Sequence, residues 1–199
     1  MNESEARFSM VKERHRETFE KAKKEGKADL PFIPLCDFIA GTEKFFTSSC
    51  CSGRTMLLGL EPGGGKKESF FHAKWHRKIS FQEFWKEIGK KEKKGFELWL
   101  KSEPFILHIG TDSLKNAEKV LIAMKNSGVK RGGIIYARPG KFMIEVIGTQ
   151  GFSLPVKGNG KLLVSREYLE TLVEKANDKM GKNLERMKLF EKKCREIMK

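Results

Sequence analysis

The chain has 199 residues, enough for one hydrophobic core, and at roughly 150 residues per domain we expect a single domain over residues 1–199. Its 40 Lys and Arg against 26 Asp and Glu give a formal net charge of +14. This excess of one sign favours a polyanionic partner, because each phosphate that a Lys or Arg neutralises releases condensed counterions. Charge alone does not name RNA, and the Lys/Glu-rich surface common in heat-stable proteins is the alternative.

What the sequence lacks disfavours several other classes of protein. No apolar stretch approaches the roughly 18 residues of a membrane span, so no membrane partner is expected. The acidic start has no apolar signal core, and we therefore expect a cytoplasmic location. No Cys-x-x-Cys spacing occurs, so we expect neither a metal site nor a disulfide framework from the four cysteines, Cys36, Cys50, Cys51 and Cys194.

Helical patterns dominate the N-terminal part of the chain, about residues 1–45. Apolar residues fall near helical spacing among many charges between residues 6 and 24, which predicts an amphipathic helix that ends near Gly26. A short second helix is predicted over residues 32–40.

Strand patterns follow in the predicted sheet-containing core, about residues 46–164. Hairpins are predicted at the turn-rich residues 61–67 and around Pro139-Gly140. The strands are predicted at residues 54–60, 69–76, 96–101, 105–109, 133–138, 142–147 and 162–164.

Three further helices are predicted from their N-terminal caps. Ser80 and Glu83 have the spacing of a capping box, and Ser113 precedes a second apolar-periodic segment. Ser165 precedes a long helix over about residues 165–199, whose apolar stripe continues for some thirty residues, roughly 45 to 50 Å at 1.5 Å per residue. The other face of this helix is heavily basic.

Small hydroxyl and thiol side chains precede a Gly-Arg pair in the run from Thr47 to Arg54, Thr-Ser-Ser-Cys-Cys-Ser-Gly-Arg. Hydroxyls and backbone N–H groups bind anions, Gly53 lets a ligand approach the backbone, and Arg54 offers a bidentate charged fork. A Ser-rich turn without a ligand is the alternative, and the residues alone leave the two readings balanced.

In the predicted strand 69–76, alternation places His72, Lys74 and His76 on one face and the apolar side chains on the other. Histidines four residues apart on a strand are roughly 13 Å apart, too far to share one zinc ion. The basic face suits a phosphate or a base, and a solvated strand face is the alternative.

Residues 45–54 resemble the signature of the tRNA wybutosine-synthesising methyltransferases, which is two aromatics, Thr-Thr-Ser-Ser and then Cys-Ser-Gly-Arg. The likeness extends from about residue 37 to residue 190. Cys50 and Gly132 depart from the pattern, since Ser is expected at both. The other similar stretches include Lys74-Trp75-His76, residues 103–108, residues 126–129 and residues 168–183.

This resemblance implies methyl transfer from S-adenosylmethionine to ring nitrogen N-4 of a wybutosine precursor, a modified guanosine beside the anticodon of phenylalanine tRNA. It also implies an α+β fold, with a strongly bent mixed β-sheet like a half-barrel, packed helices and a long C-terminal helix. The sequence has no strand followed by a Gly-x-Gly-x-x-Gly turn that opens a helix, so a Rossmann-type methyltransferase is not expected. No obligate protein partner is inferred.

Candidate site residues follow from the resemblance and the chemistry together. A ring N–H loses its proton during methyl transfer, and His76 or His108 are candidate bases because an imidazole titrates near neutral pH. For His108, a histidine hydrogen-bonded in or beside the core is the alternative. No covalent intermediate is needed, so Cys51 is not expected to be a nucleophile. The candidate substrate or cofactor contacts are Ser49, Cys51, Ser52, Gly53, Arg54, Lys74, Trp75, Arg131 and Arg138.

Two other functions stay open at this point. A basic RNA-binding module without catalysis would present tRNA to another enzyme. A hydrolase that handles phosphoryl groups would use the Ser-rich run, although the sequence contains no evident acidic cluster for a metal.

Overall fold

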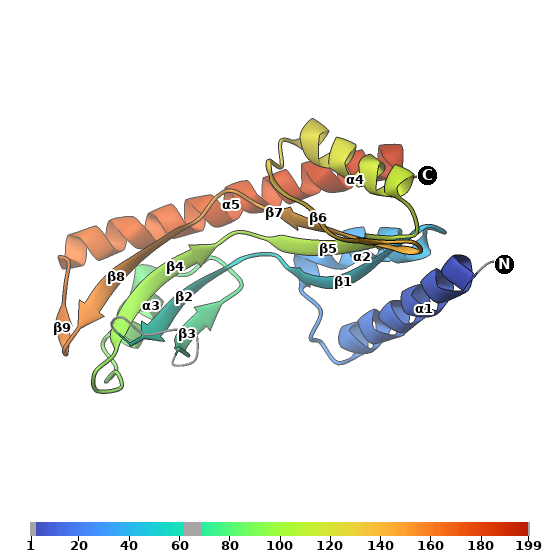
Figure 1. Ribbon diagram of the computed structural model, residues 1–199. Coiled ribbons are helices and arrows are strands. Elements are labelled where there is room, and N and C mark those ends of the chain that lie inside the picture. Colours follow the sequence, from blue (N-terminus) through green and yellow to red (C-terminus); the bar gives the residue numbers. More distant parts are fainter. Residues whose placement is uncertain (1–2, 62–68, 199) are drawn as a thin grey trace. The chain divides into compact units, whose positions relative to one another are not determined.

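The computed structural model describes residues 3–61 and 69–198, so the hairpin loop predicted at residues 61–67 lies, apart from Glu61, outside the described residues. Figure 1 labels the helices and strands. The chain divides into two compact units, neither of which is one continuous stretch of sequence, and the single domain therefore stays a prediction. Unit 1 comprises Met1–Ser52, Phe105–Thr149 and Leu184–Lys199, and unit 2 comprises Gly53–Pro104 and Gln150–Asn183.

Unit 1 contains a four-stranded antiparallel sheet in the order β1-β5-β7-β6. Its strands are β1 (Phe45–Cys51), β5 (Ile106–Thr111), β7 (Lys141–Ile147) and β6 (Arg131–Arg138). Its helical elements are α1 (Glu3–Lys24), η1 (Leu30–Phe32), α2 (Ile33–Gly41), α4 (Leu114–Ser127) and the last part of α5 (Arg166–Ile197).

One face of this sheet forms the core of unit 1. Alternate strand residues such as Leu107 and Ile144 are fully buried there, against side chains from α2, α4 and the last part of α5. Burial of one such side chain contributes about 1.5 to 3 kcal/mol. The Ser113 hydroxyl accepts a hydrogen bond from the Asn116 amide and caps α4, as predicted, and Gly128 ends that helix in the left-handed conformation.

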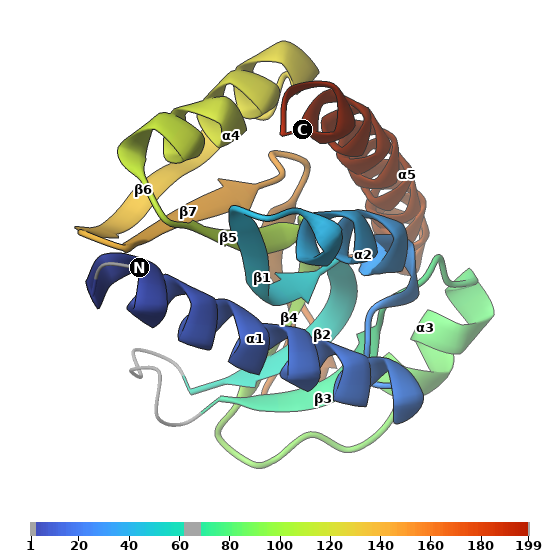
Figure 2. The ribbon, with the colours of Figure 1, turned by 90° about the vertical axis from the view of Figure 1, so that its right-hand side faces the viewer.

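We call the other face of the sheet in unit 1 the open face. α1 packs on it beside β1, with its first residues against the β6–β7 turn, on the opposite side of the sheet from α4 (Figure 2). The ring of Phe8 lies 5.9 Å from that of Phe46 on β1, and the His15 ring stacks on the same phenyl ring at 4.9 Å. The ammonium group of Lys12 anchors α1 by donating to the main-chain carbonyls of Ala40, Thr42 and Phe45.

Unit 2 contains a five-stranded antiparallel sheet in the order β3-β2-β4-β8-β9. Its strands are β3 (Phe70–Trp75), β2 (Arg54–Leu60), β4 (Glu97–Glu103), β8 (Phe152–Gly158) and β9 (Lys161–Leu162). α3 (Phe81–Ile88) and the first part of α5 supply buried apolar side chains to its core. The capping box predicted for Ser80 and Glu83 is present at the start of α3.

The sheets differ from the predicted mixed sheet, because every strand pair among the described residues is antiparallel. The α+β class and the long C-terminal helix are confirmed. Among the described helices, none combines the length and the apolar character that crossing a membrane requires.

The strict alternation predicted for residues 69–76 is wrong. The pairing of β2 with β3 shifts register between Leu57 and Leu58, and the shift leaves His72 as an extra residue in β3. Phe71 is consequently exposed together with Lys74, while Ala73 packs on the core of unit 2. His76 lies just beyond the end of β3.

Candidate functional site

The signature run forms most of β1 rather than the predicted loop or turn. Thr47 to Cys51 pair with β5, and the register shifts between Thr47 and Ser49. This irregularity sets Ser49 opposite His108, and β7 places Glu145 on the other side of the same histidine. Neighbouring residues in a row across a sheet share one face, so these three side chains lie together on the open face.

Hydrogen bonds join these three side chains into a chain across β1, β5 and β7. The Ser49 Oγ lies 2.7 Å from His108 Nδ1, and His108 Nε2 lies 3.1 Å from Glu145 Oε2. His108 and Glu145 are 25% and 27% exposed. An ionised carboxylate only accepts hydrogen bonds, so Glu145 favours the tautomer with its proton on Nε2. The lone pair on Nδ1 then faces Ser49.

A cavity of about 220 Å³ lies between α1, residues 27–29 and β1. Cavities for drug-sized ligands are about 300–1,000 Å³, so this one suits a part of such a molecule. Burial, followed by the charges of Lys141 and Arg14, lowers the pKa of His15 in its wall. The cavity is lined by His15, Thr18, Phe19, Ala22, Lys27, Ala28, Asp29, Thr47, Ser48, Ser49 and Cys50.

Asp29 holds the end of the signature run against the loop that precedes α2. Its carboxylate accepts hydrogen bonds from the Ser52 amide at 2.6 Å and from the Ser52 hydroxyl at 2.9 Å. Ser52 is only 3% exposed, and its hydroxyl already has Asp29 as a partner. Its predicted contact with a ligand stays a prediction. Sequence reasoning missed Asp29, for which no local pattern provides a signal.

The two adjacent cysteines of the run differ in environment. Cys50 packs on the core of unit 1, and the Cys36 thiol donates a hydrogen bond to it, which lowers the pKa of Cys50 and raises that of Cys36. Cys51 lies opposite Ile106 and is half-buried. Cys50 therefore contributes to the packing of this core.

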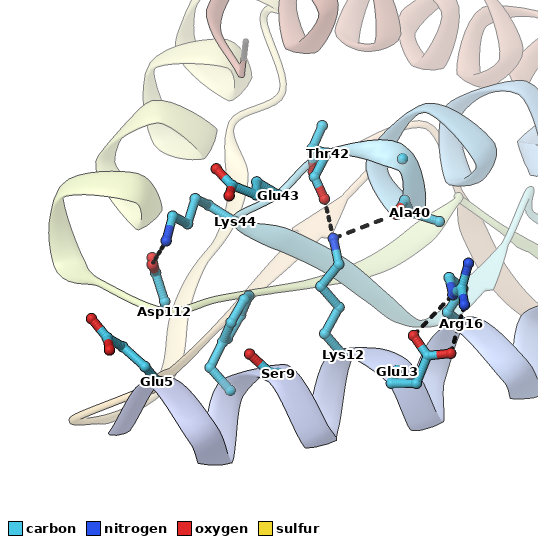
Figure 3. A pocket seen from close by; sticks show the side chains of 12 residues that line it. Glu5, Ser9, Lys12, Glu13, Arg16, Ala40, Thr42, Glu43, Lys44 and Asp112 are labelled. Atoms are coloured by element: carbon cyan, nitrogen blue, oxygen red, sulfur yellow. Dashed lines mark hydrogen bonds and ion pairs between the residues drawn. The ribbon is translucent and has the colours of Figure 1, made fainter. Parts of the chain in front are cut away.

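A larger cavity in unit 1, of about 620 Å³, contains no residue of the signature run (Figure 3). Most of its charged groups contact one another or the main chain. Arg16 contacts Glu13 at 2.6 Å, Lys44 lies 3.6 Å from Asp112, and Lys12 is held by carbonyl groups. Despite its size, this cavity is the weaker candidate, because no residue of the signature run lines it.

The candidate residues of unit 2 gather around one exposed aromatic ring. The Arg54 guanidinium donates from Nε to Glu103 Oε2 at 2.8 Å and lies 5.2 Å from the centre of the Phe71 ring. Lys74 Nζ lies 5.1 Å from the same ring. Trp75 is partly buried against the core of unit 2.

The remaining candidates in unit 2 are Gly53 and His76. Gly53 precedes β2 with a φ of +94°, a conformation that favours glycine, and His76 is exposed. Their predicted roles stay predictions.

Arg131 and Arg138 lie at the two ends of β6, an edge strand of the sheet in unit 1, and both are exposed. Between them Gly132 has a φ of +112°, and a Cβ there would collide with the carbonyl oxygen of Glu145. The absence of the expected Ser at this position thus has a steric reason.

A hydroxyl beside a histidine that is oriented by a carboxylate suits two kinds of chemistry. The histidine can activate the serine as a nucleophile for acyl or phosphoryl transfer, or it can remove a proton from a bound substrate. The geometry by itself leaves both reactions open.

Comparison with known proteins separates these reactions. The family model described as Methyltransferase TYW3 matches residues 7–196. A protein of Pyrococcus horikoshii named tRNA(Phe) 7-((3-amino-3-carboxypropyl)-4-demethylwyosine(37)-N(4))-methyltransferase 1 is 34% identical over 90% of this chain and 96% of its own length. The human tRNA wybutosine-synthesizing protein 3 homolog is 31% identical over 84% of this chain and 64% of its own length.

Solved structures agree with these relatives. A protein structure from Pyrococcus horikoshii has a TM-score of 0.87 and 32% identity, and the match covers 94% of this chain and 95% of that one. A hypothetical protein from Aeropyrum pernix has a TM-score of 0.70 and 27% identity, covering 83% of this chain and 96% of its own. Fold and sequence together define a tRNA methyltransferase. The chain belongs to the TYW3 family.

Proposed function

We propose that this chain methylates the N-4 ring nitrogen of a 4-demethylwyosine-type nucleoside at residue 37 of phenylalanine tRNA, with S-adenosylmethionine as the methyl donor. The relative from Pyrococcus horikoshii, which the chain matches over 96% of the relative's length, is named for this reaction. The observation that carries the proposal is the hydrogen-bonded row of Ser49, His108 and Glu145 beside the hydroxyl-lined cavity.

The cavity beside β1 fits part of the methyl donor. Its hydroxyl groups and the Asp29 carboxylate, which also holds Ser52, suit the hydroxyls and the ammonium group of such a molecule. Lys27, which also contacts Glu25 at 2.7 Å, suits its carboxylate. S-adenosylmethionine supplies an activated methyl group: the N–CH₃ bond forms as the S–CH₃ bond breaks, and the sulfur keeps the bonding pair. The antiparallel pairing of the described strands supports the prediction that no Rossmann-type sheet binds the donor.

His108 receives the proton that the substrate nitrogen loses. Its Nδ1 lone pair accepts the proton directly or through the Ser49 hydroxyl, and Glu145 stabilises the imidazolium that results. His76 in unit 2 is the second candidate base. Positioning of the substrate supplies much of the rate. To be positioned, the target base must leave its stack.

Basic side chains hold the tRNA in this proposal. Arg54, Lys74, Arg131 and Arg138 contact phosphates, and Trp75 contributes packing beside them. Ser49, Cys51, Ser52 and Gly53 shape the site around the methyl donor and the target base. Recognition requires no metal and no obligate protein partner.

The test is methyl transfer from labelled S-adenosylmethionine to phenylalanine tRNA that carries the demethylated precursor. We expect one methyl group per tRNA in the digested nucleoside. Ser49→Ala should slow transfer, whereas Ser153→Ala, an exposed serine on β8, should not. Tight, salt-sensitive tRNA binding without any transfer by the unaltered protein would instead identify a tRNA-binding module.

A further inference from the structure

The open face carries a half-buried aromatic ring and three basic side chains along β6 and the β6–β7 turn, where the start of α1 lies against Gly140. Tyr136 stands opposite Met143, and Arg138 stands opposite Lys141, at the β6 edge of the sheet. Arg131 lies at the other end of β6. These four residues, Arg131, Tyr136, Arg138 and Lys141, are called the β6 platform below.

A bulge in β6 turns Tyr136 toward this face. The pairing with β7 shifts register between Ile134 and Tyr136, and the extra residue, Ile135, is 56% exposed. Without the shift, alternation from the half-buried Ile134, which packs on the core, would place residue 136 on the core side as well. The bulge therefore adds an aromatic ring to the open face.

Two cations contact the Tyr136 ring. The Arg138 guanidinium lies 5.7 Å and the Lys141 ammonium 5.6 Å from the ring centre. On the same face of β6, a Cβ at Gly133 would meet no atom within 4 Å, so there is open space above that residue. Both cations lie over the ring, so a base can stack on this ring when the two cations turn to its phosphates.

The platform is continuous with the proposed reaction site. Gly133 ends the row that runs from Ser49 through His108 and Glu145. From β1 to β6 are three strand spacings, roughly 14 Å, which a few extended nucleotides span. Glu145 is the acidic side chain in this row, and its carboxylate is paired with His108.

We propose that the β6 platform binds an unpaired nucleotide that neighbours the methylated one in the substrate tRNA. The base stacks on Tyr136, and Arg138 and Lys141 contact the adjoining phosphates. The inference rests on the proposed function for the identity of the RNA. It adds a base-stacking site to the phosphate contacts.

The test uses an anticodon stem-loop RNA with the fluorescent base 2-aminopurine next to residue 37, titrated with protein. Stacking is worth about 1–3 kcal/mol per base, so Tyr136→Leu should raise the Kd roughly 5- to 150-fold and remove the fluorescence quenching on binding. Tyr136→Phe should keep the Kd within about twofold, because it keeps the ring. Tyr136→Ala provides a second variant without an aromatic ring.

The control is Lys192→Ala, which removes an exposed lysine of α5 and tests for unspecific effects of losing a surface side chain. Its Kd should match that of the unaltered protein. Equal affinity and quenching in Tyr136→Leu, Tyr136→Ala and the unaltered protein would overturn the platform, even if methyl transfer proceeds. Absence of methyl transfer by the unaltered protein would overturn the proposed function, whereas a binding loss specific to the variants without a ring would still support the platform.

Discussion

His108 contacts both Ser49 and Glu145 because the three residues occupy one row of the sheet in unit 1. The proposed base is thus oriented by residues that are 59 and 37 positions away in the sequence. In the proposed reaction Glu145 orients the ring and stabilises its protonated form.

Replacing His108 by Ala should lower the single-turnover rate by roughly 10²–10⁴-fold, the usual contribution of a general base. Glu145→Leu should cost about ten- to a hundredfold, since it removes a hydrogen bond to a charged group. Glu145→Gln should recover most of this loss, because its amide oxygen still accepts the Nε2 proton. Full activity in Glu145→Leu would show that the carboxylate does not position the ring.

His15 gives the cavity a pH dependence that can be measured. Burial, and then the charges of Lys141 and Arg14, lowers its pKa in the folded chain, whereas the unfolded chain keeps a value of about 6.5. Between the lowered folded-state pKa and about pH 6.5, the unfolded state therefore binds a proton that the folded state does not. The free energy of unfolding falls as the pH is lowered through this range.

Urea unfolding at pH 7 and pH 5 tests this. The unaltered protein should lose more unfolding free energy between these values than His15→Phe, which keeps a ring against Phe46. An identical loss in both proteins would show that His15 does not titrate differently on folding.

Sequence reasoning reached Ser49 and His108 as candidates but missed Glu145, Asp29 and Tyr136. Ser49 stands in the signature run and His108 in an apolar run, so the local sequence points to both. Glu145 and Asp29 acquire their roles only through pairing with distant strands or loops. Glu145 did leave one trace, a lone carboxylate between Ile144 and Val146.

Among the elements, those with strong periodicity were predicted best. α3 and α4 begin at the predicted caps, and the strand predicted at 54–60 matches β2. β1 was missed because its Ser and Cys residues favour turns, and its strand form depends on pairing with β5. β8 was missed because Pro155 interrupts it; there the structure accommodates the proline at a register shift against β4.

The bulged edge strand β6 should be sensitive to a side chain at Gly132. Gly132→Ala would force a φ of +112° on a residue with a Cβ and would push that atom against the Glu145 carbonyl. We expect a loss of about 1–3 kcal/mol or more in the free energy of unfolding, measured with urea. Gly41→Ala, where a Cβ meets no atom within 4 Å, is the matched control and should lose nothing. Equal stability of both variants would contradict the steric account.

For the whole molecule, the charge of +14 predicts steep salt dependence of tRNA binding. If Arg54, Lys74, Arg131 and Arg138 each contact one phosphate, raising salt from 0.05 to 0.2 M should weaken binding about 50- to 150-fold. Fluorescence anisotropy would measure this, with binding of S-adenosylmethionine, which releases few counterions, as the comparison. A Kd for tRNA that is constant across this range would exclude the predicted phosphate contacts.

The alternation of the chain between its two units has a consequence for biosynthesis. Unit 1 receives its last segment, Leu184–Lys199, only after unit 2 has been made, and Met187, Phe190, Cys194 and Met198 of that segment belong to its buried core. The sheet of unit 1 is complete as sequence by Ile147. Until the final turns of α5 leave the ribosome, the apolar sheet face of the nascent chain is therefore covered only in part, by α2 and α4. During this period chaperone binding or aggregation competes with folding.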